Sequence, residues 1–177
     1  MVRQLKPKRL LEIGSGHSTL VSAAACARNA EEGFPVEFVS VDPEPRLPIS
    51  DVHGLSRAER RSAAELPLER FASLDAGDIL FVDTTHTVKR GGEVNYLVLE
   101  VLPSLREGVV VHFHDIFLPY DYPPEWFDRG WYLTEQYLLQ AFLVANPLYE
   151  VVVAGHALSR AHHDRSEERR VGKECRL

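Results

Sequence analysis

Cysteine is scarce in this sequence, with two cysteines among 177 residues. Cys26 stands in an alanine-rich stretch and Cys175 in a charged one, and neither has a partner at the spacing of a zinc site. A disulfide framework and a structural zinc site are therefore not expected. Low cysteine usage of this kind is typical of a cytoplasmic protein, which is the setting we expect.

Long apolar runs are also lacking. No run reaches the roughly 18 residues of a transmembrane helix, and the basic residues 1–9 have no apolar signal core. Bases are outnumbered, since 20 Lys and Arg face 26 Asp and Glu, for a net charge of -6. An acidic chain is poorly suited to nucleic acid or an anionic membrane, so we expect neither as a partner.

Apolar residues are plentiful enough for a core, at 45% of the sequence. The length predicts one domain, which we place at residues 1–164. Residues 165–177 are charged and have almost no apolar content. We expect this tail to be disordered or loosely helical and not to belong to the native protein.

Strand and helix patterns alternate along the chain. Strands are predicted over residues 9–13, 36–42, 78–83, 108–115 and 149–154, with a weaker one near 62–66. Helices are predicted over residues 18–29, 56–61, 67–74 and 92–102, and a further one contains residues 138–143 and ends at 146–147. Because the strands are apolar without alternation, they favour a mostly parallel sheet covered on both faces, a Rossmann-like, doubly wound α/β fold.

A glycine turn lies between the first strand and the first long helix. Glu12 ends the apolar run, Gly14 and Gly16 follow, and Ser18 or Thr19 is the predicted N-cap of the helix. Glycine lets a ligand approach the backbone, and a helix start offers unpaired N–H groups and a positive dipole end. A nucleotide or nucleoside suits such a turn, although many tight turns of this kind are only structural.

Three other predicted strands also end in polar residues. Asp42 ends the second, Asp83 ends the strand at 78–83, and His114 and Asp115 end the strand at 108–115. Ligands of parallel α/β folds bind beyond the carboxyl ends of the strands. Four polar strand ends at one edge are the strongest functional indication in the sequence.

These stretches resemble a known family. Residues 12–18 are similar to the first motif of class I S-adenosylmethionine-dependent methyltransferases, Glu/Asp-x-Gly-x-Gly-x-Gly, with Ser18 in place of the last glycine. Residues 39–42 resemble the second motif. Residues 78–86 and 109–115 resemble strands of the subgroup of small-molecule O-methyltransferases and cephalosporin-hydroxylase-like proteins. The resemblance covers about residues 9–154 and is poor between 43 and 72.

The resemblance implies S-adenosylmethionine as cofactor and methyl transfer to oxygen of a small-molecule acceptor. The family's first acid contacts the methionine part, and its second acid accepts hydrogen bonds from the ribose. The cofactor-binding residues implied here are Glu12, Gly14, Ser15, Gly16, Ser18 and Asp42. Asp42 would also suit the ribose of NAD, but Glu12 departs from the dinucleotide pattern. The family has further N-terminal helices and a seventh strand, so we expect the chain to be truncated.

Asp83, His114 and Asp115 are candidate metal ligands. Carboxylates suit Mg²⁺, whereas His114 suits Mn²⁺, Fe²⁺ or Zn²⁺ better. A metal here would bind two oxygens of a diol or catechol-like acceptor and lower the pKa of its hydroxyl. The alternative is that Asp83 caps the following helix while His114 and Asp115 order the next loop.

His86, three residues after Asp83, is a candidate general base. The predicted catalytic residues are His86, Asp83 and His114, ahead of His112, which shares a strand face with His114. The aromatic residues of the next loop form either a substrate lid or a satellite core; they are Tyr120, Tyr122, Trp126 and Trp131. A metal-dependent hydroxylase-like relative on the same fold and a non-catalytic nucleotide-binding fragment remain alternative functions.

Overall fold

The computed structural model describes residues 1–49 and 51–162. The chain forms two compact units, Met1–His114 and a second that begins at Asp115. The single domain over residues 1–164 stays a prediction, and the tail at 165–177 lies outside the described residues. Within the described ranges, every helix is too short or too polar to cross a membrane.

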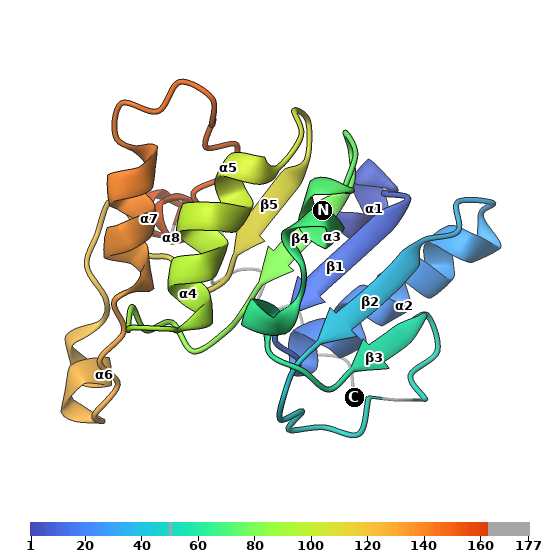
Figure 1. Ribbon diagram of the computed structural model, residues 1–177, viewed down its shortest axis with the longest axis horizontal. Helices are drawn as coiled ribbons and strands as arrows, with labels where there is room; N and C mark the ends of the chain where they lie inside the picture. The colour runs from blue at the N-terminus through green and yellow to red at the C-terminus, as the bar shows by residue number, and fades with distance from the viewer. Residues whose placement is uncertain (50, 163–177) are drawn as a thin grey trace. The chain divides into compact units, whose positions relative to one another are not determined.

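A five-stranded sheet forms the centre of the first unit (Figure 1). Its strand order is β3-β2-β1-β4-β5, and all four neighbouring pairs are parallel, which confirms the predicted fold class. The strands are β1 (Arg9–Ile13), β2 (Glu37–Val41), β3 (Arg57–Glu59), β4 (Ile79–Val82) and β5 (Val110–Phe113).

The register of these pairs aligns the strand ends. Ile13 lies opposite both Val41 and Val82, and Val82 lies opposite Phe113. The residues that directly follow these positions are Gly14, Asp42, Asp83 and His114. The predicted row of polar strand ends at one edge of the sheet is therefore confirmed.

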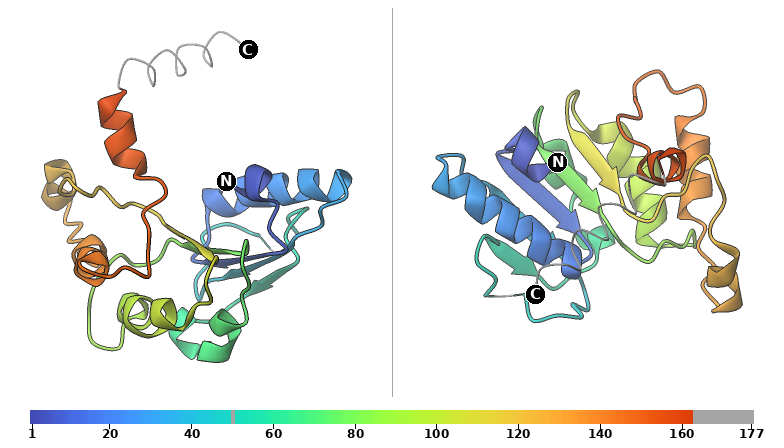
Figure 2. Two further views of the ribbon diagram at one scale, coloured as in Figure 1. Left: turned by 90° about the horizontal axis from the view of Figure 1, so that it is seen from above. Right: turned by 180° about the vertical axis from the view of Figure 1, so that it is seen from behind.

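Helices cover both faces of the sheet (Figure 2). On one face, Ala23 and Cys26 of α2 (His17–Glu31) pack with Leu10, Phe38 and Ile79 of the strands. The other helices of this unit are α1 (Val2–Leu5), η1 (Ala63–Glu65), α3 (Leu68–Ala72), α4 (Glu93–Tyr96), η2 (Leu97–Val101) and α5 (Leu102–Ser104).

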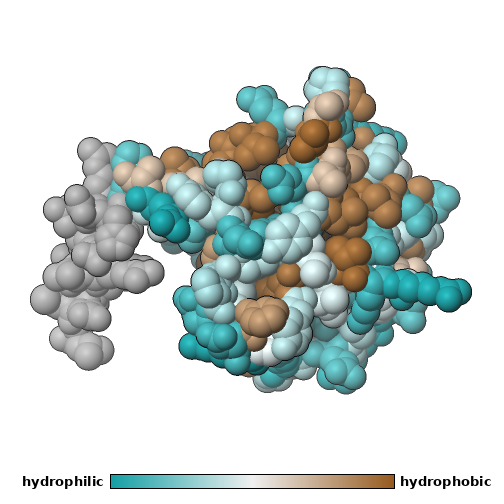
Figure 3. Space-filling view, turned by 90° about the vertical axis from the view of Figure 1, so that its left-hand side faces the viewer, coloured by the Kyte–Doolittle hydropathy of each residue, from teal (hydrophilic) through white to brown (hydrophobic). Residues whose placement is uncertain are grey.

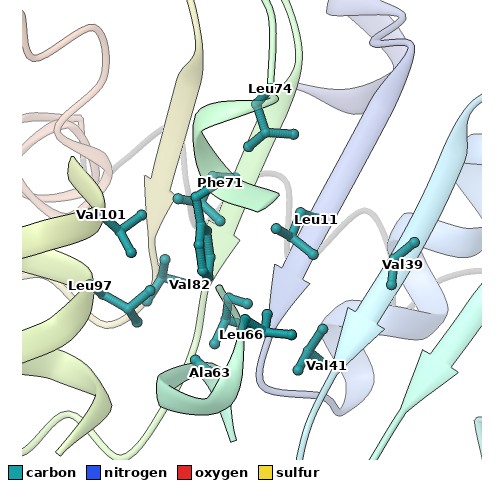
Figure 4. Packing of buried hydrophobic residues seen from close by; sticks show 12 residues of the cluster. Leu11, Val39, Val41, Ala63, Leu66, Phe71, Leu74, Val82, Leu97 and Val101 are labelled. Carbon is teal, nitrogen blue, oxygen red and sulfur yellow. The ribbon is translucent and has the colours of Figure 1, made fainter. Parts of the chain in front are cut away.

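The opposite face holds the larger core cluster (Figure 4). Leu66 and Phe71, from the segment between β3 and β4, pack with Leu97 of η2 against Leu11 and Val82 of the strands. Phe71 is fully buried. Strands β1, β2 and β4 send apolar side chains to both faces, so they do not alternate between apolar and polar residues.

The helix predicted over 92–102 is confirmed in extent but is not regular. Its middle turn, η2, is a π-helix, in which the Leu102 N–H donates to the Leu97 oxygen. Pro103 follows at once. Proline lacks an N–H, and its ring clashes with the carbonyl four residues earlier, so a wider turn ahead of Pro103 accommodates it.

Two predictions between residues 43 and 72 are wrong. Residues 57–59 form β3 rather than a helix, and residues 63–65 form η1 rather than a strand. Strand β3 takes the edge position beside β2. The Ser62 hydroxyl accepts from the Ala64 N–H at 3.3 Å and so caps η1.

The second unit contains α6 (Pro124–Asp128), α7 (Glu135–Leu143) and α8 (Gly155–Ala161). Helix α7 confirms the helix predicted through residues 138–143, but it ends at Leu143 rather than at 146–147. The strand predicted over 149–154 is wrong, because this segment pairs with no strand among the described residues. Val151, Val152 and Val153 are 62%, 81% and 67% exposed. Figure 3 shows that apolar side chains reach the surface in several places on one side of the molecule. A β-branched run forms a strand only where an edge is present to pair with it.

We expect Gly14→Ala to destabilise the protein more than Gly33→Ala. Both glycines have positive φ, +90° and +85°, so alanine strains the backbone by about 1 kcal/mol at either. At Gly14 the added β-carbon would also lie 1.6 Å from the Asp83 backbone oxygen, whereas Gly33 has open space. Urea unfolding should show an additional loss of roughly 1–3 kcal/mol for Gly14→Ala. Equal losses in the two variants would contradict this account.

Candidate functional site

Glu12 anchors the glycine turn from inside the sheet. It is 1% exposed, and its two carboxylate oxygens accept from the hydroxyls of Thr19 at 2.7 Å and Ser18 at 3.2 Å. Burial raises the pKa of Glu12, while the hydroxyls of Thr19, Ser40 and Ser18 oppose that rise. The carboxyl therefore acts as a buried acceptor that holds the first turn of α2 against the sheet.

Helix α2 begins earlier than predicted, and its N-cap is Gly16 rather than Ser18 or Thr19. The Thr19 hydroxyl accepts from the Gly16 N–H at 3.0 Å while donating to Glu12. The two predicted caps thus lie inside the first turn, where Glu12 holds them. Sequence reasoning missed this role of Thr19, because no local pattern indicates a pairing across seven residues.

Asp42 closes the glycine turn from the neighbouring strand. Its Oδ2 accepts from the N–H and the hydroxyl of Ser15 at 2.8 and 2.6 Å, and its Oδ1 accepts from the Glu44 N–H at 2.8 Å. A carboxylate has about four acceptor positions, so these three bonds leave one for a ligand. Asp42 is therefore both fixed in place and able to accept from a ligand hydroxyl.

The two glycines of the turn have different surroundings. Gly14 N–H donates to the Val41 oxygen at 2.8 Å, and the missing side chain of Gly14 leaves room for the backbone of Asp83. A β-carbon added at Gly16 would meet nothing within 4 Å. Gly14 thus permits the close approach of β1 and β4, while Gly16 borders open space that a ligand can use.

Asp83 and two histidines come together beyond β4 and β5. Asp83 Oδ1 lies 3.2 Å from His86 Nε2 and 3.8 Å from His114 Nδ1. His86 is buried and has a φ of +54°, a left-handed backbone conformation that is uncommon for non-glycine residues but is adopted by histidine more often than by most. A buried imidazole beside a carboxylate is suited to hold and transfer a proton.

The alternative role of Asp83 as a helix cap is wrong. The following helix, α4, has Gly92 as its N-cap, nine residues further along the chain.

Asp83, His114 and Asp115 each offer one ligand atom, and these atoms lie within 4.8 Å of one another. Asp115 is bonded directly to His114 and has a φ of +53°. Among the described residues, no other three His, Cys, Asp or Glu side chains approach closely enough to share a metal ion. Two carboxylates and one imidazole form a donor set that fits a divalent cation.

A family model described as "Methyltransferase domain" matches residues 11–116, which is more than half of the chain. The match contains the glycine turn, Asp42, Asp83 and the pair His114–Asp115. The chain belongs to this methyltransferase domain family.

One solved structure, titled "CmcI-N160 apo-structure", is 18% identical to this methyltransferase domain with a TM-score of 0.46. The similarity covers 80% of this chain and 57% of that one. The chain therefore spans a little over half the length of that protein. No curated protein matches the sequence.

His112 of β5 lies on the same face of the sheet as His114, as predicted, and the centroids of the two rings are 6.3 Å apart. Its ring stacks on Phe81 at 4.7 Å and 7°. Burial lowers the pKa of His112, and the charge of His114 lowers it further. His112 is half-buried and packs on Phe81, and its place behind the other two histidines as a catalytic candidate stays a prediction.

The aromatic residues that follow β5 pack largely on one another. The ring of Phe117 meets Tyr122 at 5.6 Å and Trp126 at 5.1 Å between centroids. Tyr120 and Trp131 are exposed. The satellite-core interpretation thus describes Tyr122 and Trp126, while a lid formed by Tyr120 and Trp131 stays a prediction.

Glu12→Gln is expected to change how stability varies with pH. The pKa of Glu12 is raised above its ordinary value of 4.5 in the folded chain, mainly by burial. The contribution of Glu12 to the free energy of unfolding is therefore complete below pH 4.5, and it is lost as the pH rises through the pKa of Glu12 in the folded chain. Glutamine has no such proton to lose, so the variant should gain stability relative to the unchanged protein as the pH rises above 4.5 and through the raised pKa of Glu12.

Urea unfolding at several pH values measures this difference in the free energy of unfolding. Glu37→Gln, at an exposed acid that begins β2, is the matched control. If the difference in the free energy of unfolding between Glu12→Gln and the unchanged protein stays constant with pH, burial does not shift the pKa of this carboxyl.

Proposed function

We propose that this methyltransferase domain binds S-adenosylmethionine and transfers its methyl group to an oxygen of a small-molecule acceptor. The observation that carries the proposal is the register that places Gly14, Asp42 and Asp83 directly after three aligned strand ends. Family membership supports methyl transfer as the activity. The net charge of -6 supports a small molecule rather than nucleic acid as acceptor, and low cysteine usage supports a cytoplasmic setting.

The residues of the glycine turn fit this cofactor. Gly16 borders open space, and the first-turn N–H groups of α2 lie beside it. Asp42, held by Ser15, has an acceptor position left for a ribose hydroxyl. Glu12 and Ser18 would keep the turn in shape beneath the methionine part. When bound, the cofactor supplies a methyl group activated by a positively charged sulfur.

His86 is the proposed base for the acceptor hydroxyl. Asp83 lies 3.2 Å from its Nε2 and would hold the ring with that nitrogen protonated. The imidazole would then take the proton from the acceptor hydroxyl during methyl transfer. The chain's main contribution would be to align the oxygen with that bond.

We also propose that Asp83, His114 and Asp115 hold a divalent metal ion. The imidazole in this donor set favours Mn²⁺, Fe²⁺ or Zn²⁺ over Mg²⁺. A metal at this place would lower the pKa of the acceptor hydroxyl. His114 would then act as a ligand, and the proton would pass to His86.

Calorimetric titration with S-adenosylhomocysteine tests the cofactor proposal. We expect binding in the micromolar range, and Asp42→Ala should weaken it by about tenfold, because a hydrogen bond from the ribose is lost. Asp51→Ala, at an exposed acid outside the glycine turn, should leave the affinity unchanged. Tighter binding of NAD than of S-adenosylhomocysteine would point to a dinucleotide site, and binding of neither would remove the proposal.

Equilibrium dialysis with Mn²⁺ and Mg²⁺ tests the metal proposal. We expect Mn²⁺ to bind more tightly, and Asp83→Asn to weaken it by at least about tenfold, since a charged ligand is lost. His114→Asp should shift the preference toward Mg²⁺, because all three donors then become oxygen. His53→Gln, at an exposed histidine before β3, is the control. Equal Mn²⁺ affinity in the unchanged protein and in Asp83→Asn would contradict the site.

A further inference from the structure

One buried side chain, Gln136 of α7, fixes the loop that follows Asp115. Gln136 is 1% exposed. Its Oε1 accepts from the Phe117 N–H at 3.0 Å, and its Nε2 donates to the Tyr120 oxygen at 3.3 Å. Its own backbone N–H donates to the Tyr122 hydroxyl at 3.1 Å. Three hydrogen bonds therefore tie the loop to the start of this helix.

These bonds suit an amide in particular. A primary amide offers an acceptor and donors on one small head, so it can satisfy a backbone N–H and a backbone oxygen of the same loop. Gln136 stands in the first turn of α7, where backbone N–H groups lack partners within the helix, and the Tyr122 hydroxyl supplies one. Burial raises the pKa of Tyr122, so its hydroxyl stays neutral.

The rings of the loop pack around the same point. Phe117 meets Trp126 edge-on at 5.1 Å, and Tyr122 meets Tyr137, the residue after Gln136, edge-on at 5.8 Å. The loop backbone is therefore held by polar bonds at its core and by aromatic packing around them. A segment held in this way can keep a neighbouring residue in a strained conformation.

Asp115 is that neighbouring residue. It lies two positions before Phe117 and has a φ of +53°, which is unfavourable for a residue with a β-carbon. On the basis of the metal site proposed above, we propose that Gln136 is a positioning residue for it. By holding the Phe117 N–H, Gln136 keeps the backbone of Asp115 in the left-handed conformation that presents its carboxylate as a metal ligand.

Mn²⁺ affinity and hydrogen exchange of the Phe117 amide test this role together. Gln136→Met keeps the size of the side chain but removes both of its loop bonds, and Gln136→Glu keeps an acceptor for Phe117. Gln140→Met, at an exposed position of the same helix, is the matched control. We expect Gln136→Met to weaken Mn²⁺ binding by about tenfold and to speed exchange at Phe117, while Gln140→Met stays within about threefold of the unchanged protein. Gln136→Glu keeps the bond to Phe117 but loses the donor to the Tyr120 oxygen, so its loss of Mn²⁺ affinity should be smaller than that of Gln136→Met.

Several outcomes separate this proposal from the metal site itself. Normal Mn²⁺ affinity in Gln136→Met with faster exchange at Phe117 would overturn the positioning role alone. Equal losses in Gln136→Met and Gln136→Glu would also overturn it, because the acceptor would not matter. Absence of Mn²⁺ binding by the unchanged protein would overturn the metal site and the positioning role together. If Gln136→Met does not fold, Tyr122→Phe decides, since it releases the Gln136 N–H and should weaken Mn²⁺ binding without loss of the ring.

Discussion

Gly14 has no β-carbon, and the backbone oxygen of Asp83 lies where one would be. That close approach lets the Asp83 N–H donate to the Ile13 oxygen at 2.8 Å, while the Gly14 N–H donates to the Val41 oxygen at 2.8 Å. The central strand is thus bonded to both neighbours one residue beyond its end. These two bonds place the glycine turn, the candidate cofactor site, at the same edge of the sheet as Asp83, the proposed partner of His86 in proton transfer.

Two acids at this edge have different roles because their surroundings differ. Glu12 is buried, and its two oxygens accept from the hydroxyls of Ser18 and Thr19, so it stabilises the turn from inside. Its contact with the cofactor stays a prediction. Asp42 is only half-buried, and its bonds to Ser15 leave it an acceptor position. The structure thus separates residues that resemble cofactor contacts equally well in the sequence.

Periodicity predicts buried strands well and edge strands poorly. Strand β4 is apolar throughout and β1 is apolar apart from Arg9 and Glu12, so their positions and the alignment of Asp83 with the glycine turn follow from the sequence. Strand β3 is Arg-Ala-Glu, so it has no run of apolar residues that would predict a strand; it lies at the edge of the sheet, where its side chains are only partly buried or exposed. Residues 149–154 show the opposite failure, since β-branched residues there have no edge to join. The link from Gln136 to Phe117 spans 19 positions, and no local pattern predicts it.

Backbone conformation offers a separate indication of the site. Four non-glycine residues among those described have positive φ, and two of them, Lys6 and Ala145, lie just after helices, where a left-handed residue is a common ending. The other two are His86 and Asp115, and neither follows a helix. Such strain persists only where neighbouring groups hold it. Asp83 holds the ring of His86, and Gln136 fixes the loop beyond Asp115. The two left-handed residues that no helix end accounts for are therefore the ones proposed to carry the proton and the metal.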